Sequence, residues 1–127
     1  AAAQPATSEL KPALLANLAR RRARLGDPER ARTLLGEAEG LVPGVLDLDR
    51  AANFANIAAS YLALGDDVAM WRLYALAFDA AETLANARPR VLAVVEICRS
   101  LGRNRVELNP RTRERLDALL AGLHEPW

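Results

Sequence analysis

The chain has 127 residues, of which 26% are charged and 5% aromatic, and its formal net charge is only +1. This length suits one domain or a short array of repeats, and the balanced charge excludes the general attraction of a highly basic protein to nucleic acid or anionic lipid. A single cysteine excludes an internal disulfide and a cysteine-rich metal site, and the lack of alternating β-branched residues predicts an all-α protein.

The first residues, AAAQPATSE, are small or polar and contain no methionine. They resemble the stub that remains after removal of a signal peptide, which favours an exported protein, periplasmic or secreted, over a cytoplasmic one. We expect residues 1–7 to be flexible and the first helix to run from Ser8, as its N-cap, to Leu25. Pro12 then falls in the first helical turn, where its missing N–H costs little.

Caps and prolines divide the rest of the chain into five further helices. Asp27 and Pro28 supply an N-cap and a first helical residue, and Asn109 and Pro110 repeat the device. Residues 103–108 are predicted to be an irregular loop. The helices are predicted at residues 28–41, 47–64, 67–87, 89–102 and 110–123, with acidic caps from Asp47 or Asp49 and from Asp66 or Asp67, and residues 124–127 form a tail.

One short pattern occurs three times along the chain. Aligned on Gly26, Gly65 and Gly102, the preceding residues read LANLARRRARLG, FANIAASYLALG and VLAVVEICRSLG. A second helical pattern follows each glycine. The sequence therefore predicts three helix–turn–helix units that stack on a shared core. Their predicted bounds are residues 8–44, 47–87 and 88–123, within one domain at residues 8–123, and the positions predicted to be equivalent include Leu18, Ile57 and Val94.

Large apolar, small and aromatic residues occupy recurring places in these units. They are Leu15, Leu18, Ala19, Gly26, Ala31, Leu35, Ala38 and Pro43 in the first unit, and Phe54, Ile57, Ala58, Tyr61, Gly65, Ala69, Tyr74 and Ala77 in the second. This arrangement resembles the tetratricopeptide (TPR) family of helical repeats. The spacing here exceeds the family's unit of about 34 residues, and the third unit matches mainly in its first helix. The resemblance implies a right-handed array of about six helices.

The resemblance also implies a non-enzymatic protein–protein interaction module, a subunit or adaptor of a larger assembly that holds a partner in a groove or on an exposed helical face. Polar side chains on the first helix of each unit are predicted to face that groove, where they can hydrogen-bond an extended or helical segment. The alternative is that they are ordinary solvated residues. These groove candidates are Asn17, Arg20, Arg24, Asn56, Glu96 and Arg99.

Three aromatic residues are candidates for a contact with a partner or with a second copy of the chain. Trp71 and Phe78 lie in a segment that is apolar on more than one side, and Trp127 ends the polar tail. Because aromatic side chains dominate many interfaces, an uncovered Trp71 or Phe78 would mark such a contact. The alternative is that a central helix buries both. Cys98 has apolar neighbours and is predicted to be a small buried core residue.

Arginine supplies all but one of the 17 basic residues, which is the pattern of a GC-rich coding bias. The run Arg20–Arg24 is an alternative site, for nucleic acid or another anion. Successive residues on a helix point about 100° apart, so the run spreads around the axis and forms no single stripe. A second cluster with the same alternative function comprises Arg103, Arg105, Arg111 and Arg115.

The sequence shows no nucleophile beside a base, no metal-ligand spacing of His, Cys, Asp or Glu, and no glycine loop for phosphate. We therefore expect no enzymatic activity, no cofactor and no metal. An alternative from another class is a small ligand held between helices beside Tyr61, Tyr74 or Cys98.

Overall fold

The computed structural model describes residues 5–122, with side chains from residue 10 onward. Within that part of the chain it contains six α-helices, one short 3₁₀ helix and no strand, which confirms the all-α prediction. Trp127 and the rest of the predicted tail lie outside the described residues. The elements are α1 (Pro5–Arg24), α2 (Pro28–Leu41), η1 (Val42–Gly44), α3 (Asp47–Ala63), α4 (Asp67–Glu82), α5 (Ala87–Arg103) and α6 (Pro110–Ala121).

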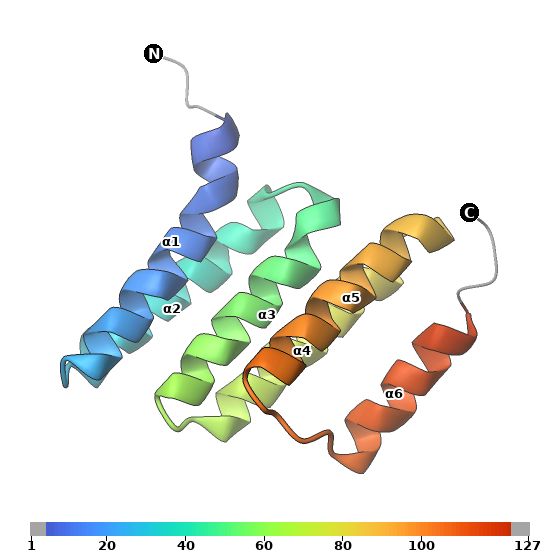
Figure 1. The fold of residues 1–127 in the computed structure, drawn as a ribbon. Coiled ribbons are helices and arrows are strands. Elements are labelled where there is room, and N and C mark those ends of the chain that lie inside the picture. The colour runs from blue at the N-terminus through green and yellow to red at the C-terminus, as the bar shows by residue number, and fades with distance from the viewer. Residues whose placement is uncertain (1–4, 123–127) are drawn as a thin grey trace.

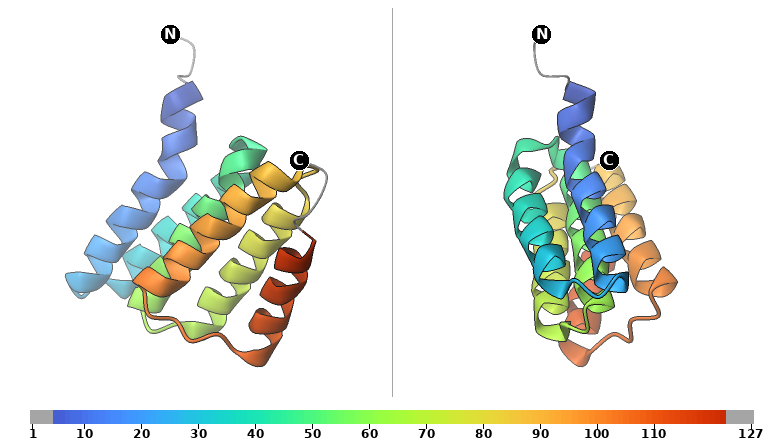
Figure 2. Two further views of the ribbon diagram at one scale, coloured as in Figure 1. Left: turned by 45° about the vertical axis from the view of Figure 1, so that its right-hand side comes forward. Right: turned by 90° about the vertical axis from the view of Figure 1, so that its left-hand side faces the viewer.

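The helices form two layers. In Figure 1, α1, α3 and α5 lie side by side in front, and α2 and α4 lie behind them. The central helix is α3, which packs against α1, α2, α4 and α5. The views in Figure 2 show α6 beside α4, at the end of the array farthest from α1. The core between the layers is built from apolar side chains that are fully buried, among them Leu35, Ile57, Leu73, Phe78 and Ile97.

Three helices begin with the predicted side-chain cap. The carboxylate or amide oxygens of Asp27, Asp66 and Asn109 accept the backbone N–H three residues later, over 3.2, 3.1 and 2.8 Å. Each bond satisfies one of the N–H groups that have no partner in the first turn of a helix. The capping predictions for α2, α4 and α6 are therefore confirmed.

Other predicted boundaries are wrong. Asp47 and Asp49 are not caps but lie in the first turn of α3, where their charge suits the positive end of the helix dipole, and Leu46 precedes them without a side-chain cap. The fourth helix ends at Glu82 rather than near residue 87, and α5 already begins at Ala87, two residues before Pro89. A proline fits there because the first turn needs no bond from its nitrogen.

The first helix starts earlier than predicted. It begins at Pro5, a residue type whose fixed φ suits the first helical position, so residues 5–7 are helical and Ser8 is not the N-cap. As a result Pro12 lies inside the helix and is buried. A proline there removes one backbone hydrogen bond, and α1 changes direction in its N-terminal half, as Figure 1 shows.

A left-handed residue ends the first helix of each unit. Gly26 and Gly65 have φ values of 82° and 75°, and the third such residue is Arg105, with a φ of 55°. At all three places this residue donates its N–H to the carbonyl three residues back, and the next residue donates to the carbonyl five residues back. This pair of bonds is the Schellman closure of a helix. The corners are 39 and 40 residues apart.

The prediction that Gly102 forms the third corner is therefore wrong. Gly102 lies inside α5, which ends at Arg103 with Asn104 as its C-cap. The third unit is shifted by three residues from its predicted alignment, so that Leu18 and Ile57 are equivalent to Ile97 and not to Val94. The irregular loop likewise begins one residue later than predicted, because Arg103 is still helical.

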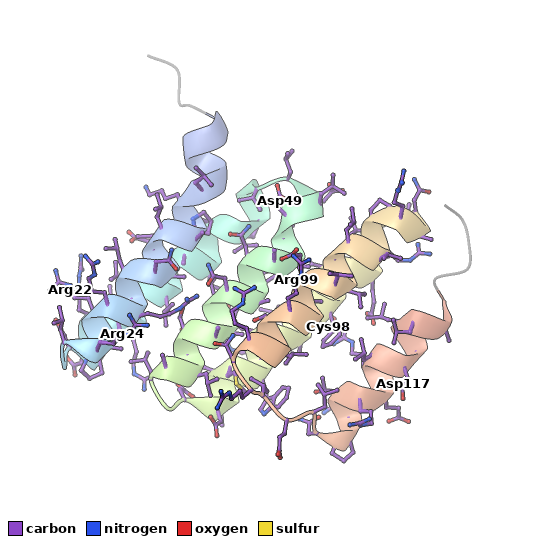
Figure 3. The ribbon with its side chains drawn as sticks, viewed as in Figure 1. Arg22, Arg24, Asp49, Cys98, Arg99 and Asp117 are labelled. Carbon is purple, nitrogen blue, oxygen red and sulfur yellow. The ribbon has the colours of Figure 1, made fainter. Side chains whose placement is uncertain are left out.

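Cys98 is exposed, which contradicts its prediction as a core residue. In the corrected alignment it is equivalent to Ala19 and Ala58, and both of those are buried. The difference arises because α6 does not pack closely along α5 as α2 packs along α1. Three additional residues between the corner and the cap of α6 displace that helix toward α4. Figure 3 labels Cys98 on the outer side of α5.

The corrected alignment predicts opposite effects for one substitution at two glycines. Gly65→Ala should lower the free energy of unfolding by about 1 kcal/mol, because alanine is strained at positive φ. Gly102→Ala should raise it by about 0.5 kcal/mol, because alanine is the better helix former. An added Cβ meets no atom within 4 Å at either site, so a steric clash contributes to neither change in the free energy of unfolding. Urea denaturation measures both changes, and destabilisation by Gly102→Ala would contradict the alignment.

Candidate functional site

A groove of about 550 Å³ crosses the layer formed by α1, α3 and α5. The three helices run side by side there, and small side chains on α3 leave the space between its neighbours unfilled. The residues that line this groove are Leu10, Ala13, Asn17 and Arg20 from α1, Asp49, Ala52, Asn53, Ala55, Asn56 and Ala59 from α3, and Glu96, Ser100, Arg103 and Asn104 from α5 and its C-cap.

Alanines and amides alternate along the lining. Ala52, Ala55 and Ala59 lie along α3, where a methyl group is all that separates a bound molecule from the helix backbone. Asn53 and Asn56, one helical turn apart, stand beside them. The amide nitrogen of Asn53 donates to the backbone carbonyl of Asp49 over 2.8 Å, and the side-chain oxygen of Asn56 accepts from Arg20. An amide carries both a donor and an acceptor, so these residues still offer an extended chain the oxygen of Asn53 and the nitrogen of Asn56.

Four of the six groove candidates line the groove, namely Asn17, Arg20, Asn56 and Glu96. Arg24 and Arg99 do not. Figure 3 places Arg24 at the end of α1 and Arg99 on α5, and both side chains are exposed. The guanidinium of Arg99 lies 3.6 Å from the carboxylate of Glu96 on the same helix.

Arg20 binds the neighbouring helix. Its Nε donates to Ser60 Oγ over 2.8 Å, and its Nη2 donates to the backbone carbonyl of Asn56 over 3.1 Å and to the side-chain oxygen of the same residue. Partial burial lowers the pKa of Arg20, and the positive charges of Arg24 and Arg103 lower it further. The side chain therefore joins α1 to α3 and, together with Arg103, makes one end of the groove electropositive.

Two serines join neighbouring helices of the front layer through equivalent hydrogen bonds. Ser60 Oγ of α3 lies 3.3 Å from the carbonyl oxygen of Ala16, and Ser100 Oγ of α5 lies 3.3 Å from that of Ala55. Both serines are buried. Ala16 and Ala55 are equivalent in the corrected alignment, and so are the two serines. The contact is thus part of the repeat, although the predicted alignment could not reveal it.

Ser100 also holds α4 to α5. Its Oγ lies 2.8 Å from the hydroxyl of Tyr74, which is completely buried. Burial raises the pKa of Tyr74 and favours the neutral phenol, which can donate this bond. Tyr74 was named as a neighbour of a small ligand, and its hydroxyl is already occupied by a protein partner.

Sequence reasoning missed several lining residues. Asp49 was interpreted only as a cap, and Asn53 was not considered although it stands one turn before Asn56 on α3. With Gly102 as the predicted corner, Arg103 and Asn104 fall in the predicted loop, and Arg103 is a candidate only as part of the arginine cluster. The available signal was the helical spacing of Asn53 and Asn56, which puts both amides on one face.

The aromatic candidates are more covered than an exposed contact requires. Phe78 is buried in the apolar core, against the hypothesis that it stays uncovered, and the guanidinium of Arg115 lies 5.5 Å from the centre of its ring. Trp71 is half-buried, with its ring 6.1 Å from that of Tyr74. Trp71 also lines a second cleft, of about 500 Å³, between α4 and the start of α6.

The predicted cluster of arginines near the C-terminus is divided between two places. Arg103 lines the groove, whereas Arg111 and Arg115 line the cleft between α4 and α6. Arg115 forms ion pairs with Asp79 and Glu82 of α4, and these carboxylates raise its pKa. Its charge is therefore matched within the chain and is not offered to an external anion.

In the part of the chain that the structure describes, no three His, Cys, Asp or Glu side chains gather where they could hold a metal ion. Among the same residues, no helix combines the length and the apolar character needed to cross a lipid bilayer. Comparison of the chain with models of protein families, with curated proteins and with solved structures finds no match.

The contacts of Arg20 predict different stability effects for two arginines on α1. Arg20→Ala should lower the free energy of unfolding by about 1 kcal/mol, because it removes hydrogen bonds from a charged group to α3. Arg24→Ala, at an exposed position, should change it by less than about 0.5 kcal/mol. Chemical denaturation monitored by circular dichroism measures both. Equal effects would contradict a joining role for Arg20.

Proposed function

We propose that the chain is a non-enzymatic protein–protein interaction module, a subunit or adaptor of a larger assembly. In this proposal its helices form a right-handed, TPR-like array of three units. The groove across α1, α3 and α5 holds an extended segment of a partner protein.

Two repeated features support the proposed array. Each unit closes its first helix with the same pair of backbone bonds, at Gly26, Gly65 and Arg105. Each later unit docks on the preceding one through an equivalent serine, Ser60 or Ser100. Repetition of both the corner and the docking contact at intervals of 39 or 40 residues is what a stacked helical repeat requires.

The single observation that carries the proposed activity is the composition of the groove lining. A row of alanines on α3 lets a backbone approach the helix closely, and Asn17, Asn53 and Asn56 supply amides within its reach. Such a surface bonds the main chain of a partner and depends little on the partner's side chains. The electropositive end at Arg20 and Arg103 favours a partner with an acidic residue at that end.

A substitution that fills the groove tests this proposal. Peptides selected from a random display library for binding to the protein serve as the probes, and their affinity is measured by titration calorimetry. Ala52→Trp should weaken their binding at least about tenfold, because the indole ring occupies the space above α3. The matched control is Ala121→Trp, at an exposed position on α6 outside the groove, which should leave the affinity unchanged.

Two results would count against the proposal. One is that no peptide binds the protein with measurable affinity. The other is that the selected peptides bind the Ala52→Trp variant as tightly as the unchanged protein, which would place their site elsewhere. Circular dichroism spectra of both variants establish that each is folded.

A further inference from the structure

Three arginines surround one end of the groove with no carboxylate among them. Arg20 and Arg103 line that end, and Arg24 stands one turn after Arg20, just beyond the lining. The charges of Arg24 and Arg103 both act on Arg20, so the three guanidinium groups are electrostatic neighbours. Within the part of the chain that the structure describes, none of the three forms an ion pair.

The repeat explains why these side chains surround one place. Arg24 and Arg103 each stand two residues before the left-handed corner of their unit, and the equivalent residue of α3 is Ala63. Because α3 lies between α1 and α5, this small residue has an arginine on either side (Figure 1). Both arginines are exposed, and their side chains are long enough to reach over the alanine. A single anion above the end of α3 is therefore accessible to both.

Only neutral groups hold Arg20 in this position. Its guanidinium donates to Ser60 Oγ and to the carbonyl and side-chain oxygens of Asn56. Arg72 and Arg115, which also join neighbouring helices, bond carboxylates instead. Partial burial and the positive charges of two neighbouring arginines lower the pKa of Arg20. Its charge thus lacks the compensation that the arginines on the other side of the molecule receive.

The helix ends compensate only part of this charge. Arg24 and Arg103 lie in the last turns of α1 and α5, where the negative end of the helix dipole favours a cation. Each helix end supplies about half a negative charge, so the ends of α1, α3 and α5 offset about half of the three positive charges. The effect falls off beyond the last turn, and Arg20 stands one turn earlier. An anion from outside the chain can supply the remainder.

The number of charges and donors fits a phosphoryl group better than a carboxylate. A phosphoryl group on a side chain carries nearly two negative charges at neutral pH and presents three acceptor oxygens. Guanidinium groups bond such oxygens in pairs, and two of these groups, on Arg24 and Arg103, have no ion-pair partner among the described residues. The amide nitrogen of Asn56, whose oxygen is bonded to Arg20, is a further donor at this end.

We propose that the partner segment held in the groove carries a phosphorylated side chain, and that its phosphoryl group lies among Arg20, Arg24 and Arg103. The proposal narrows the acidic residue expected at this end to one that carries two charges. It rests on the function proposed above, because it takes the groove to hold a segment of a partner.

Two carboxylates restrict the phosphoryl group to this end. Glu96 lines the groove two turns before Arg103 on α5, about 10 Å away along the helix axis. Asp49 lines the groove from the first turn of α3. Both repel an anion, so a phosphorylated residue at the middle or the far end of the groove is disfavoured. The rest of the segment then extends from the arginines along the alanines of α3.

Three pools of synthetic peptides test the proposal on the full chain. Each pool has degenerate positions on both sides of one fixed residue, which is phosphoserine, glutamate or serine, and its retention on the immobilised protein is measured. The phosphoserine pool should be retained at least about fivefold more than the glutamate pool, because the phosphoryl group makes more charge-assisted hydrogen bonds. Arg103→Gln should reduce its retention at least about fivefold, and Arg24→Gln, at a second exposed site, should reduce it similarly.

Arg22→Gln is the matched control, because it removes the same charge from an exposed position on α1. Figure 3 labels Arg22 on the side of α1 away from α3. It should change retention of the phosphoserine pool by less than about twofold. Arg20 is left unchanged, since its bonds join α1 to α3, and circular dichroism establishes that each variant is folded.

Two results with the pools would overturn the proposal. One is equal retention of the phosphoserine and glutamate pools, and the other is an equal effect of Arg22→Gln and Arg103→Gln, which indicates general attraction to a basic surface. Inorganic phosphate alone should bind at least about tenfold more weakly than the phosphoserine pool, because it makes no bonds along the groove. Equal binding would assign the site to free phosphate and would also overturn the proposal.

The display-selected peptides separate this inference from the proposed function. If they bind in the groove and phosphoserine adds nothing, the inference fails and the proposed function stands. If neither they nor any of the three pools bind, both fail.

Discussion

The structure depends on the close approach of α3 to α1 and α5. Small residues make that approach available, and the serine hydroxyls of Ser60 and Ser100 bond carbonyl groups of the facing helices across it. A larger side chain at Ala16 or Ala55 would separate the helices and break these bonds, because both alanines are buried. With α3 held on both sides, the second layer of α2 and α4 covers the core from behind.

The same constraint shapes the groove. Helices that approach through alanine leave a shallow channel along their exposed sides, and the amides that border it stand on rigid helical backbone. Arg20 contributes in two ways, because it bonds α1 to Ser60 and Asn56 of α3 and also places positive charge at one end of the channel. A site that shares its residues with the packing of the array needs little ordering when a partner binds.

Local rules predicted the helices well and the alignment of the third unit badly. Caps such as Asp27 and Asn109 act through one bond to a nearby N–H, so their effect is visible in the sequence. The third corner is formed by an arginine at positive φ, a conformation that sequence reasoning assigns to glycine. Choosing Gly102 instead displaced the alignment by three residues and kept Arg103 and Asn104 out of the predicted groove. The burial of Phe78 in the core and the exposure of Cys98 follow from the packing of whole helices, which no local pattern reports.

The way in which α6 is attached determines the order in which the molecule unfolds. Arg115 joins this helix to Asp79 and Glu82 through partly exposed ion pairs, and among the described residues of α6 only Leu119 is buried in the apolar core that the other helices share. Dissolved salt screens the first kind of attraction, and sulfate and similar salts strengthen the second. At high ionic strength, the detachment of α6 and the unfolding of the other helices therefore occur as two separate thermal transitions, whereas at low ionic strength they occur as one. The last helix detaches first, while the remaining five still unfold as one cooperative body.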